Sequence, residues 1–193
     1  VHYGNNLISY PFTSNQFIAD ALGDAATNVY AIAGEGMAAL YSSGAGGWVG
    51  SLVAFEGGDG YWLVATDAFS FSFNSTDADG NGIARVAVEQ PLLRAVPEVY
   101  SYNQSDQQAF FFVNNAIIRG EALESDDVII AYNGDVVVGS RYWNGEFTDI
   151  PAIGVDSQGS EKFDDYCEVG DKVSFKVLDD STGELVEMDA DGD

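Results

Sequence analysis

Apolar and polar residues alternate along much of this chain with the period of two that is typical of β-strands. Phe69, Phe71 and Phe73 alternate with two serines. Further short runs rich in aromatic and β-branched residues also predict strands. These runs are Trp48 to Phe55, Tyr61 to Ala65, Ala109 to Val113, Val128 to Tyr132, Val136 to Val138 and Val173 to Leu178. The pattern therefore predicts a mainly β protein.

Turn residues separate these runs. Asn133-Gly134 lies between two of them and predicts a β-hairpin with a type I′ turn, in which both central residues need a positive φ. Asn144-Gly145 and Ser181-Thr182-Gly183 predict two more turns.

One short helix is predicted between Ser14, as its N-cap, and Gly23, as its stop. Four apolar residues share one face at helical spacing within this segment: Phe17, Ile18, Ala21 and Leu22.

The chain changes character between residues 77 and 97. This segment opens with an Asp- and Gly-rich loop and contains Pro91 and Pro97, which favour strand edges or linkers because proline cannot donate to a β-ladder. We therefore predict a β-rich module with one short helix over 1–76, a linker over 77–97, and an Ig-like antiparallel β-sandwich over 98–193.

The charge of the chain excludes several kinds of partner. Among 193 residues, 31 are acidic and 7 are basic, giving a net charge of −24. Because phosphate backbones are bound by clusters of Lys and Arg, we expect no nucleic-acid binding. The acidity suits high salt, divalent cations or a basic partner, and simple solubility is the alternative. With 46% hydrophobic residues, the chain is expected to fold rather than to be disordered.

Histidine and cysteine are too few for most catalytic machinery. Cys167 and His2 are each the only residue of their type, which argues against Ser-His-Asp or Cys-His catalysis and excludes an intramolecular disulfide. A glycosidase needs only two carboxylates, separated by about 5 to 10 Å. Among 31 acidic residues some pair is expected to have this separation by chance. Glu35, between two glycines, fits a turn. We predict that the protein is not an enzyme.

We expect the protein to be extracellular or on the cell surface. No apolar run approaches the about 20 residues that span a bilayer, so membrane insertion is not expected. A first residue other than Met fits a chain from which a signal peptide has been removed. If the chain is secreted, Asn74 and Asn103 match the acceptor pattern for N-glycosylation.

The segment Asp77 to Ile83 predicts a calcium site. Asp77, Asp79 and Asn81 would supply alternate oxygen ligands, followed by the carbonyl of Ile83. A helix–loop–helix calcium site ends in a bidentate carboxylate, and this chain has Val88 at that position. A complete site of that kind is therefore not expected. Either carboxylates from elsewhere complete the Ca²⁺ site, or the segment is an ordinary turn.

Tyr142 and Trp143 predict a platform for sugar rings, because they precede a turn that would expose them. An exposed aromatic face can pack against the apolar face of a pyranose. The alternative is that both rings belong to the core, which is the expectation for Trp48 and Trp62.

Three stretches of the first half resemble a module common in large secreted bacterial surface proteins. They are Asn5 to Pro11, Gly47 to Leu52 and Gly60 to Leu63, and the family pattern runs Gly-Trp-Asn-Leu-Ile-Ser and ends in Gly-Tyr-Trp. This chain departs from the pattern at Asn5, where tryptophan usually stands.

The second half resembles the non-catalytic β-sandwich repeats that follow such modules. The resemblance is carried by Gly120 to Leu123, Asp127 to Asp135, Val138-Gly139 and Gly170 to Asp179. It implies secretion and a non-catalytic role, and it carries over no active-site residue.

Together these features predict an extracellular structural or adhesive protein, calcium-stabilised and self-assembling into a filament or surface layer. Val1 to Phe12 is uncharged apart from the chain terminus and His2, and could be donated to a sheet edge of a neighbouring copy. Alternatively, it is the first strand of its own domain. The other predicted function is a carbohydrate-binding module that binds glycans through Tyr142 and Trp143.

Overall fold

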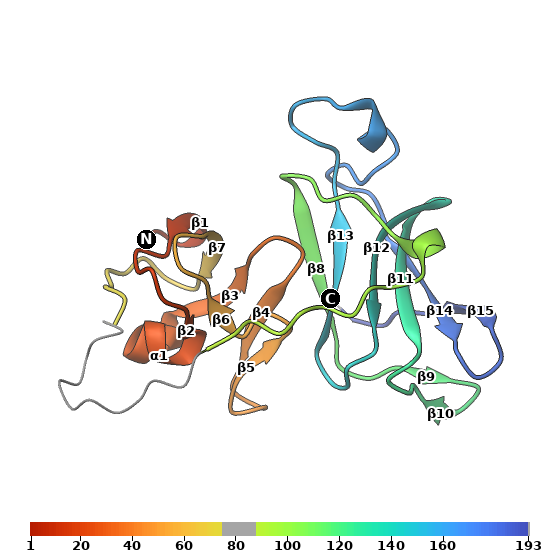
Figure 1. The fold of residues 1–193 in the computed structure, drawn as a ribbon, viewed down its shortest axis with the longest axis horizontal. Helices are drawn as coiled ribbons and strands as arrows, with labels where there is room; N and C mark the ends of the chain where they lie inside the picture. The colour runs from red at the N-terminus through yellow and green to blue at the C-terminus, as the bar shows by residue number, and fades with distance from the viewer. Residues whose placement is uncertain (75–87, 193) are drawn as a thin grey trace. The chain divides into compact units, whose positions relative to one another are not determined.

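The protein is mainly β, with antiparallel sheets and, in the part of the chain that is described, one short α-helix (Figure 1). The computed structural model describes residues 1–74 and 88–192. The chain divides into two compact units, Val1–Leu92 and Leu93–Asp193, and the division falls inside the segment predicted as a linker. Each unit has a hydrophobic core of its own.

A five-stranded antiparallel sheet forms the centre of the first unit, with the strand order β1-β7-β3-β4-β5. The strands are β1 (Gly4–Ser9), β3 (Val29–Ala33), β4 (Ala38–Ser42), β5 (Gly47–Gly50) and β7 (Gly60–Ala65), and a small separate pair is formed by β2 (Gln16–Phe17) and β6 (Ala54–Phe55). β1 pairs with β7 along its whole length. The segment expected to be donated to a neighbour is thus a strand of its own sheet.

The helix is shorter than predicted. α1 spans Ile18–Leu22 and is followed by a 3-10 helix, η1 (Gly23–Asn28). Gly23 ends α1 with a φ of 50°, as expected, but no side chain caps its first turn, so the prediction for Ser14 is wrong. The physical reason is the β2–β6 pair, which keeps the chain extended up to Phe17.

The alternating phenylalanines do not form a strand with any partner in the described chain. Phe69, Phe71 and Phe73 pack against the core of the first unit, while the serines between them are exposed. Phe73 meets Tyr10 and Phe55 edge-on, with ring centroids 5.3 and 5.4 Å apart. The predicted alternation of burial is present, but aromatic packing takes the place of the predicted β-ladder.

The second unit is sandwich-like. One layer is a four-stranded antiparallel sheet of order β12-β11-β14-β15, and the other is the β8–β13 pair. The bounds are β8 (Gln108–Val113), β9 (Ile117–Ile118), β10 (Glu121–Ala122), β11 (Val128–Asn133), β12 (Val136–Tyr142), β13 (Thr148–Ile153), β14 (Ser174–Asp179) and β15 (Glu184–Met188), with 3-10 turns η2 (Glu98–Tyr100) and η3 (Glu161–Phe163). Ile129, Val138 and Ile150 from the two layers meet in one core.

β11 is buried on both faces. Its second face, formed by Val128, Ile130 and Tyr132, is covered in part by Val96 and Tyr100. The residues on either side of Pro97 therefore contribute to the packing of the second unit, to which they belong. Earlier in the predicted linker, the Gln90 carboxamide oxygen accepts the N–H groups of Val53 and Ala54 at 2.9 and 3.1 Å within the first unit.

The hairpin between β11 and β12 is present with a different turn. Asn133 pairs with Val136, so the loop residues are Gly134 and Asp135. Gly134 has a φ of 59°, whereas Asn133 and Asp135 do not have positive φ values, so the type I′ prediction is wrong. The side chain of Asn133 donates to the Asp171 carboxylate at 3.2 Å, which fits its place at the end of β11 rather than in the loop.

β12 and β13 approach very closely at Gly139. A Cβ atom on Gly139 would lie 1.7 Å from the carbonyl oxygen of Pro151. The pairing of β12 with β11 is shifted by one residue next to this point, between Ala131 and Tyr132. Such irregularities bend a strand, and only glycine leaves room for the backbone of β13 here.

We predict that Gly139→Ala destabilises the protein by about 3 kcal/mol or more, because the new methyl group forces the two backbones apart. Urea unfolding measures the change. Gly44→Ala is the control, since its Cβ would meet nothing closer than Ser42 Oγ at 3.8 Å. A Gly139→Ala protein as stable as wild type would show that the close approach is not required.

Candidate functional site

The predicted calcium ligands Asp77, Asp79, Asn81 and Ile83 lie outside the described residues, so the calcium site stays a prediction. Within residues 1–74 and 88–192, no group of three or more His, Cys, Asp or Glu side chains is placed to hold a metal ion.

Tyr142 and Trp143 have different surroundings. The guanidinium of Arg94 lies over the Tyr142 ring, 3.7 Å from its centroid, and pairs with Asp126 at 2.5 Å. Trp143 packs against the core of the second unit. Both side chains are half-buried. Arg94 thus occupies one face of the Tyr142 ring, and sugar binding by these two residues stays a prediction.

The two predicted glycosylation residues are exposed. The Asn74 carboxamide donates to the carbonyl of Asp20 at 2.8 Å. The Asn103 carboxamide lies 3.4 Å from the Tyr166 hydroxyl. Their modification remains untested.

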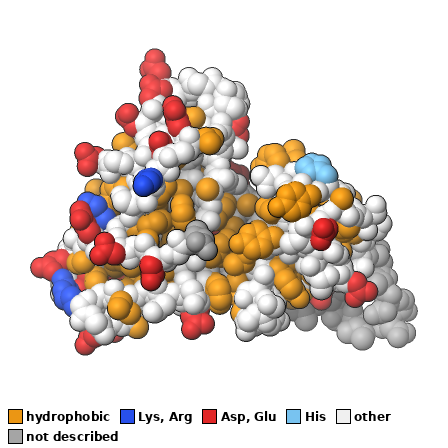
Figure 2. All heavy atoms as spheres, turned by 180° about the vertical axis from the view of Figure 1, so that it is seen from behind, with side chains coloured by type: hydrophobic (Ala, Val, Ile, Leu, Met, Phe, Trp, Pro, Cys, Tyr) orange, Lys and Arg blue, Asp and Glu red, His pale blue; other side chains and the backbone are white. Residues whose placement is uncertain are grey.

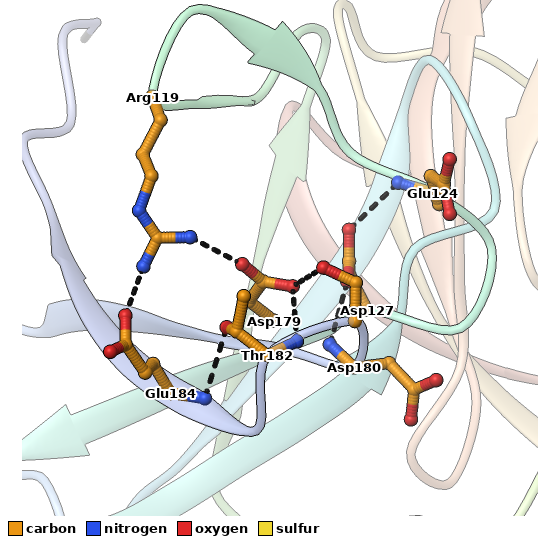
Figure 3. A network of polar contacts seen from close by, with 8 residues as sticks. Arg119, Glu124, Asp127, Asp179, Asp180, Thr182 and Glu184 are labelled. Carbon is orange, nitrogen blue, oxygen red and sulfur yellow. Dashed lines mark hydrogen bonds and ion pairs between the residues drawn. The ribbon is translucent and has the colours of Figure 1, made fainter.

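Two buried carboxylates organise the loops around β14 (Figure 3). Asp127 accepts the backbone N–H groups of Glu124 at 2.8 Å and of Asp180 at 3.0 Å. It therefore joins the loop before β11 to the turn after β14.

Asp179 is the second of these carboxylates. It accepts the Ser181 hydroxyl at 2.6 Å and the Thr182 N–H at 3.2 Å, and it pairs with Arg119 at 2.6 Å. Arg119 also pairs with Glu184 (Figure 3). The Ser181 hydrogen bond, helped by those from Thr182 and Arg119, lowers the pKa of Asp179 to about 2, although desolvation opposes the shift.

A third structural contact is the buried ion pair of Arg141 and Asp149. Arg141 Nη2 lies 3.4 Å from Asp149 Oδ2, and Arg141 Nε donates to the Asp149 carbonyl at 3.0 Å. The pair connects β12 to β13. Glu35, by contrast, is exposed in the β3–β4 turn, where Gly34 N–H donates to the Met37 carbonyl at 2.9 Å.

The first unit contains a pocket of about 550 Å³, a volume within the range of small-molecule sites. Its lining comes from the end of β2, from α1 and η1, from β4, and from the segment between Ala45 and Val53. Phe17, Tyr41 and Trp48 provide the aromatic lining, and the remaining lining residues are glycines and small or aliphatic side chains. Among the described residues, no charged side chain lines it.

Trp48 has an unusual feature in this pocket. It pairs with Tyr41 across β4 and β5, and the two rings meet at 68° with centroids 5.4 Å apart. Its indole Nε1 is buried and has no hydrogen-bond partner among the described residues. Trp48 packs on the core, as expected, whereas Trp62 is 43% exposed, so the core prediction is wrong for Trp62. Sequence reasoning missed the pocket because its lining comes from segments that are distant in the sequence.

Comparisons with protein-family models, with curated proteins and with solved structures found no match. In the described ranges, no helix is long and apolar enough to cross a membrane.

We predict that Asp179→Asn lowers the midpoint of thermal unfolding near neutral pH, because the amide cannot pair with Arg119. The pKa of Asp179 is depressed from an ordinary 3.8 to about 2, so its charge stabilises the fold fully above 3.8 and this contribution disappears as the pH falls through about 2. The difference between wild type and variant should shrink over that interval.

Thermal unfolding of both proteins across this pH range measures the effect. Asp180→Asn is the control, because the Asp180 side chain is exposed. A difference that stays constant from neutral pH down to about 2 would contradict the assignment to the Asp179 charge.

Proposed function

We propose that this protein is an extracellular structural or adhesive subunit that associates by β-strand addition at the free edge of β1. The observation that carries the proposal is the position of β1: it is the end strand of the five-stranded sheet and pairs on one side only, with β7. A further strand, from another copy or a partner, could extend the sheet there.

The backbone groups of alternate residues in β1 face this edge. Tyr10 N–H donates to the Asp59 carbonyl at 2.8 Å in continuation of the β1–β7 register. Because hydrogen-bonded pairs alternate in an antiparallel ladder, Ile8 and Asn6 also bond to β7. The N–H and C=O groups of Asn5, Leu7 and Ser9 therefore point to the open side.

The edge lacks the features that usually prevent strand addition. Such edges are normally blocked by charged side chains, proline or a β-bulge. β1 reads GNNLIS, has no charge or proline, and runs in unbroken register with β7. Leu7 is 69% exposed at its centre.

The acidity of the chain supports a regulated association. Acidic side chains are spread over the face shown in Figure 2, whereas basic ones occupy few places. Copies with a net charge of −24 repel one another until salt or divalent cations screen that charge. An extracellular setting with abundant ions would meet this condition, and the resemblance to bacterial surface modules agrees with it.

We predict that the wild-type protein forms oligomers at about 1 M NaCl, where the screening length is about 3 Å, and that Leu7→Lys raises the protein concentration needed at least about tenfold. A lysine at the edge places a charge against the incoming strand. Analytical ultracentrifugation and negative-stain microscopy measure the assemblies.

Tyr30→Lys is the matched control for this experiment. Tyr30 is 56% exposed but lies on β3, between β7 and β4, so it is not at an edge. Association that survives Leu7→Lys, or that Tyr30→Lys reduces equally, would contradict strand addition at β1.

Calcium binding is proposed for Asp77, Asp79, Asn81 and the Ile83 carbonyl, and it can be tested separately. A ligand that binds only the folded state stabilises it by about 2.7 kcal/mol at 100 times its Kd. We therefore expect millimolar calcium to raise the unfolding midpoint relative to chelator. The double variant Asp77→Asn, Asp79→Asn should lose this increase, and an equal increase in wild type and variant would refute the assignment.

A further inference from the structure

Two Asn-Gly pairs of the second unit have the same kinds of neighbour in the sequence. Asn133-Gly134 and Asn144-Gly145 each follow an aromatic residue and precede an acidic one, as Tyr-Asn-Gly-Asp and Trp-Asn-Gly-Glu. An Asn-Gly pair can lose ammonia, because glycine has no side chain to hinder the attack of its backbone nitrogen on the Asn carboxamide. Since the neighbours match, a difference in reactivity between the two pairs must come from the fold.

The fold holds Asn133 in place. Asn133 is the last residue of β11 and takes part in the ladder with β12. Its carboxamide nitrogen donates to the Asp171 carboxylate at 3.2 Å and lies 3.3 and 3.4 Å from the carbonyl oxygens of Asp165 and Tyr166. These contacts must break before the carboxamide can turn toward the nitrogen of the next residue. The loss of a hydrogen bond to a charged group slows such a reaction about tenfold or more.

The Asn144-Gly145 pair is not constrained in this way. It lies between β12 and β13, and Asn144 is exposed. Thr148 fixes the surrounding backbone, because its hydroxyl accepts the Asn144 N–H at 3.0 Å and donates to the Gly145 carbonyl at 2.7 Å. Within the described chain, the Asn144 carboxamide and the Gly145 N–H have no hydrogen-bond partner. The two groups that would react are therefore free.

We propose that Asn144 is a site of spontaneous deamidation in the folded protein, and that the fold protects Asn133. The Gly145 backbone nitrogen forms a bond to the carboxamide carbon of Asn144, and the carboxamide nitrogen leaves with the displaced proton as ammonia. The cyclic succinimide that results is then opened by water. Cleavage of one C–N bond of the ring gives aspartate, and cleavage of the other gives isoaspartate. Neither step requires an oxidant or a cofactor.

The modification changes the loop between β12 and β13. It adds a negative charge to a chain that already has a net charge of −24. Isoaspartate also places its side-chain carbon in the backbone directly after Tyr142 and Trp143, the pair predicted to bind sugar rings. An aged chain would thus differ from a new one beside that predicted site. The proposal does not depend on association at β1.

Incubation of the intact folded protein at mildly alkaline pH provides the test, because base removes the proton from the glycine nitrogen. Peptide mapping by mass spectrometry detects the exchange of a carboxamide for a carboxylate, and chromatography separates isoaspartate from aspartate. We expect Asn144 to react at least about tenfold faster than Asn133. A third pair, Asn81-Gly82, lies outside the described residues and is quantified in a peptide of its own.

The chain unfolded in urea is the control, because the matched neighbours should then give Asn133 and Asn144 similar rates. Asn144→Gln should suppress the reaction at this position, since the longer side chain cyclises much more slowly. Asp171→Ala removes the carboxylate that holds Asn133 and should speed the reaction at Asn133 alone. Equal rates at the two positions in the folded protein, or reaction of Asn144 only after unfolding, would overturn the proposal.

Discussion

Charge imbalance is the constraint on which this structure depends. With seven cationic side chains for 31 carboxylates, most acidic groups have no cation with which to pair. A carboxylate that is buried must instead be stabilised by hydrogen bonds. Asp127 accepts two backbone N–H groups, and Asp179 adds a hydroxyl and a backbone N–H to its pairing with Arg119. The loops around β14 are ordered by these contacts.

The same constraint explains where charges are missing. The strand β1 and the described lining of the Trp48 pocket have none, although the chain as a whole is strongly acidic. A carboxylate in either place would add repulsion without a nearby cation to offset it. Uncharged surface on such a protein is therefore the surface on which contact with another molecule costs least in electrostatic energy, and the open edge of β1 is a surface of this kind.

Local sequence signals predicted the parts of the fold that depend on neighbouring residues. Runs rich in aromatic and β-branched residues located β7, β8, β11 and β14, and the turn residues located the hairpin that joins β11 to β12. Predictions were wrong where a distant partner decides the outcome. Because β2 pairs with β6, α1 begins later in the chain than predicted. The alternating phenylalanines that end at Phe73 were predicted to form a strand, but Phe73 packs against Tyr10 and Phe55 instead.

The candidate sites follow the same division. The Arg141–Asp149 pair and the pocket lined by Trp48 are formed by segments that the sheets bring together. The spacing of these residues along the chain therefore does not predict either feature.

Association through an uncharged strand should still depend on salt, because the rest of the chain is strongly acidic. Association brings together two bodies of like charge, so its free energy includes a repulsion that falls as the screening length shortens from about 10 Å at 0.1 M to about 3 Å at 1 M. Ionic strength therefore acts on association at β1 through the net charge of the whole chain, because β1 itself carries no charged side chain.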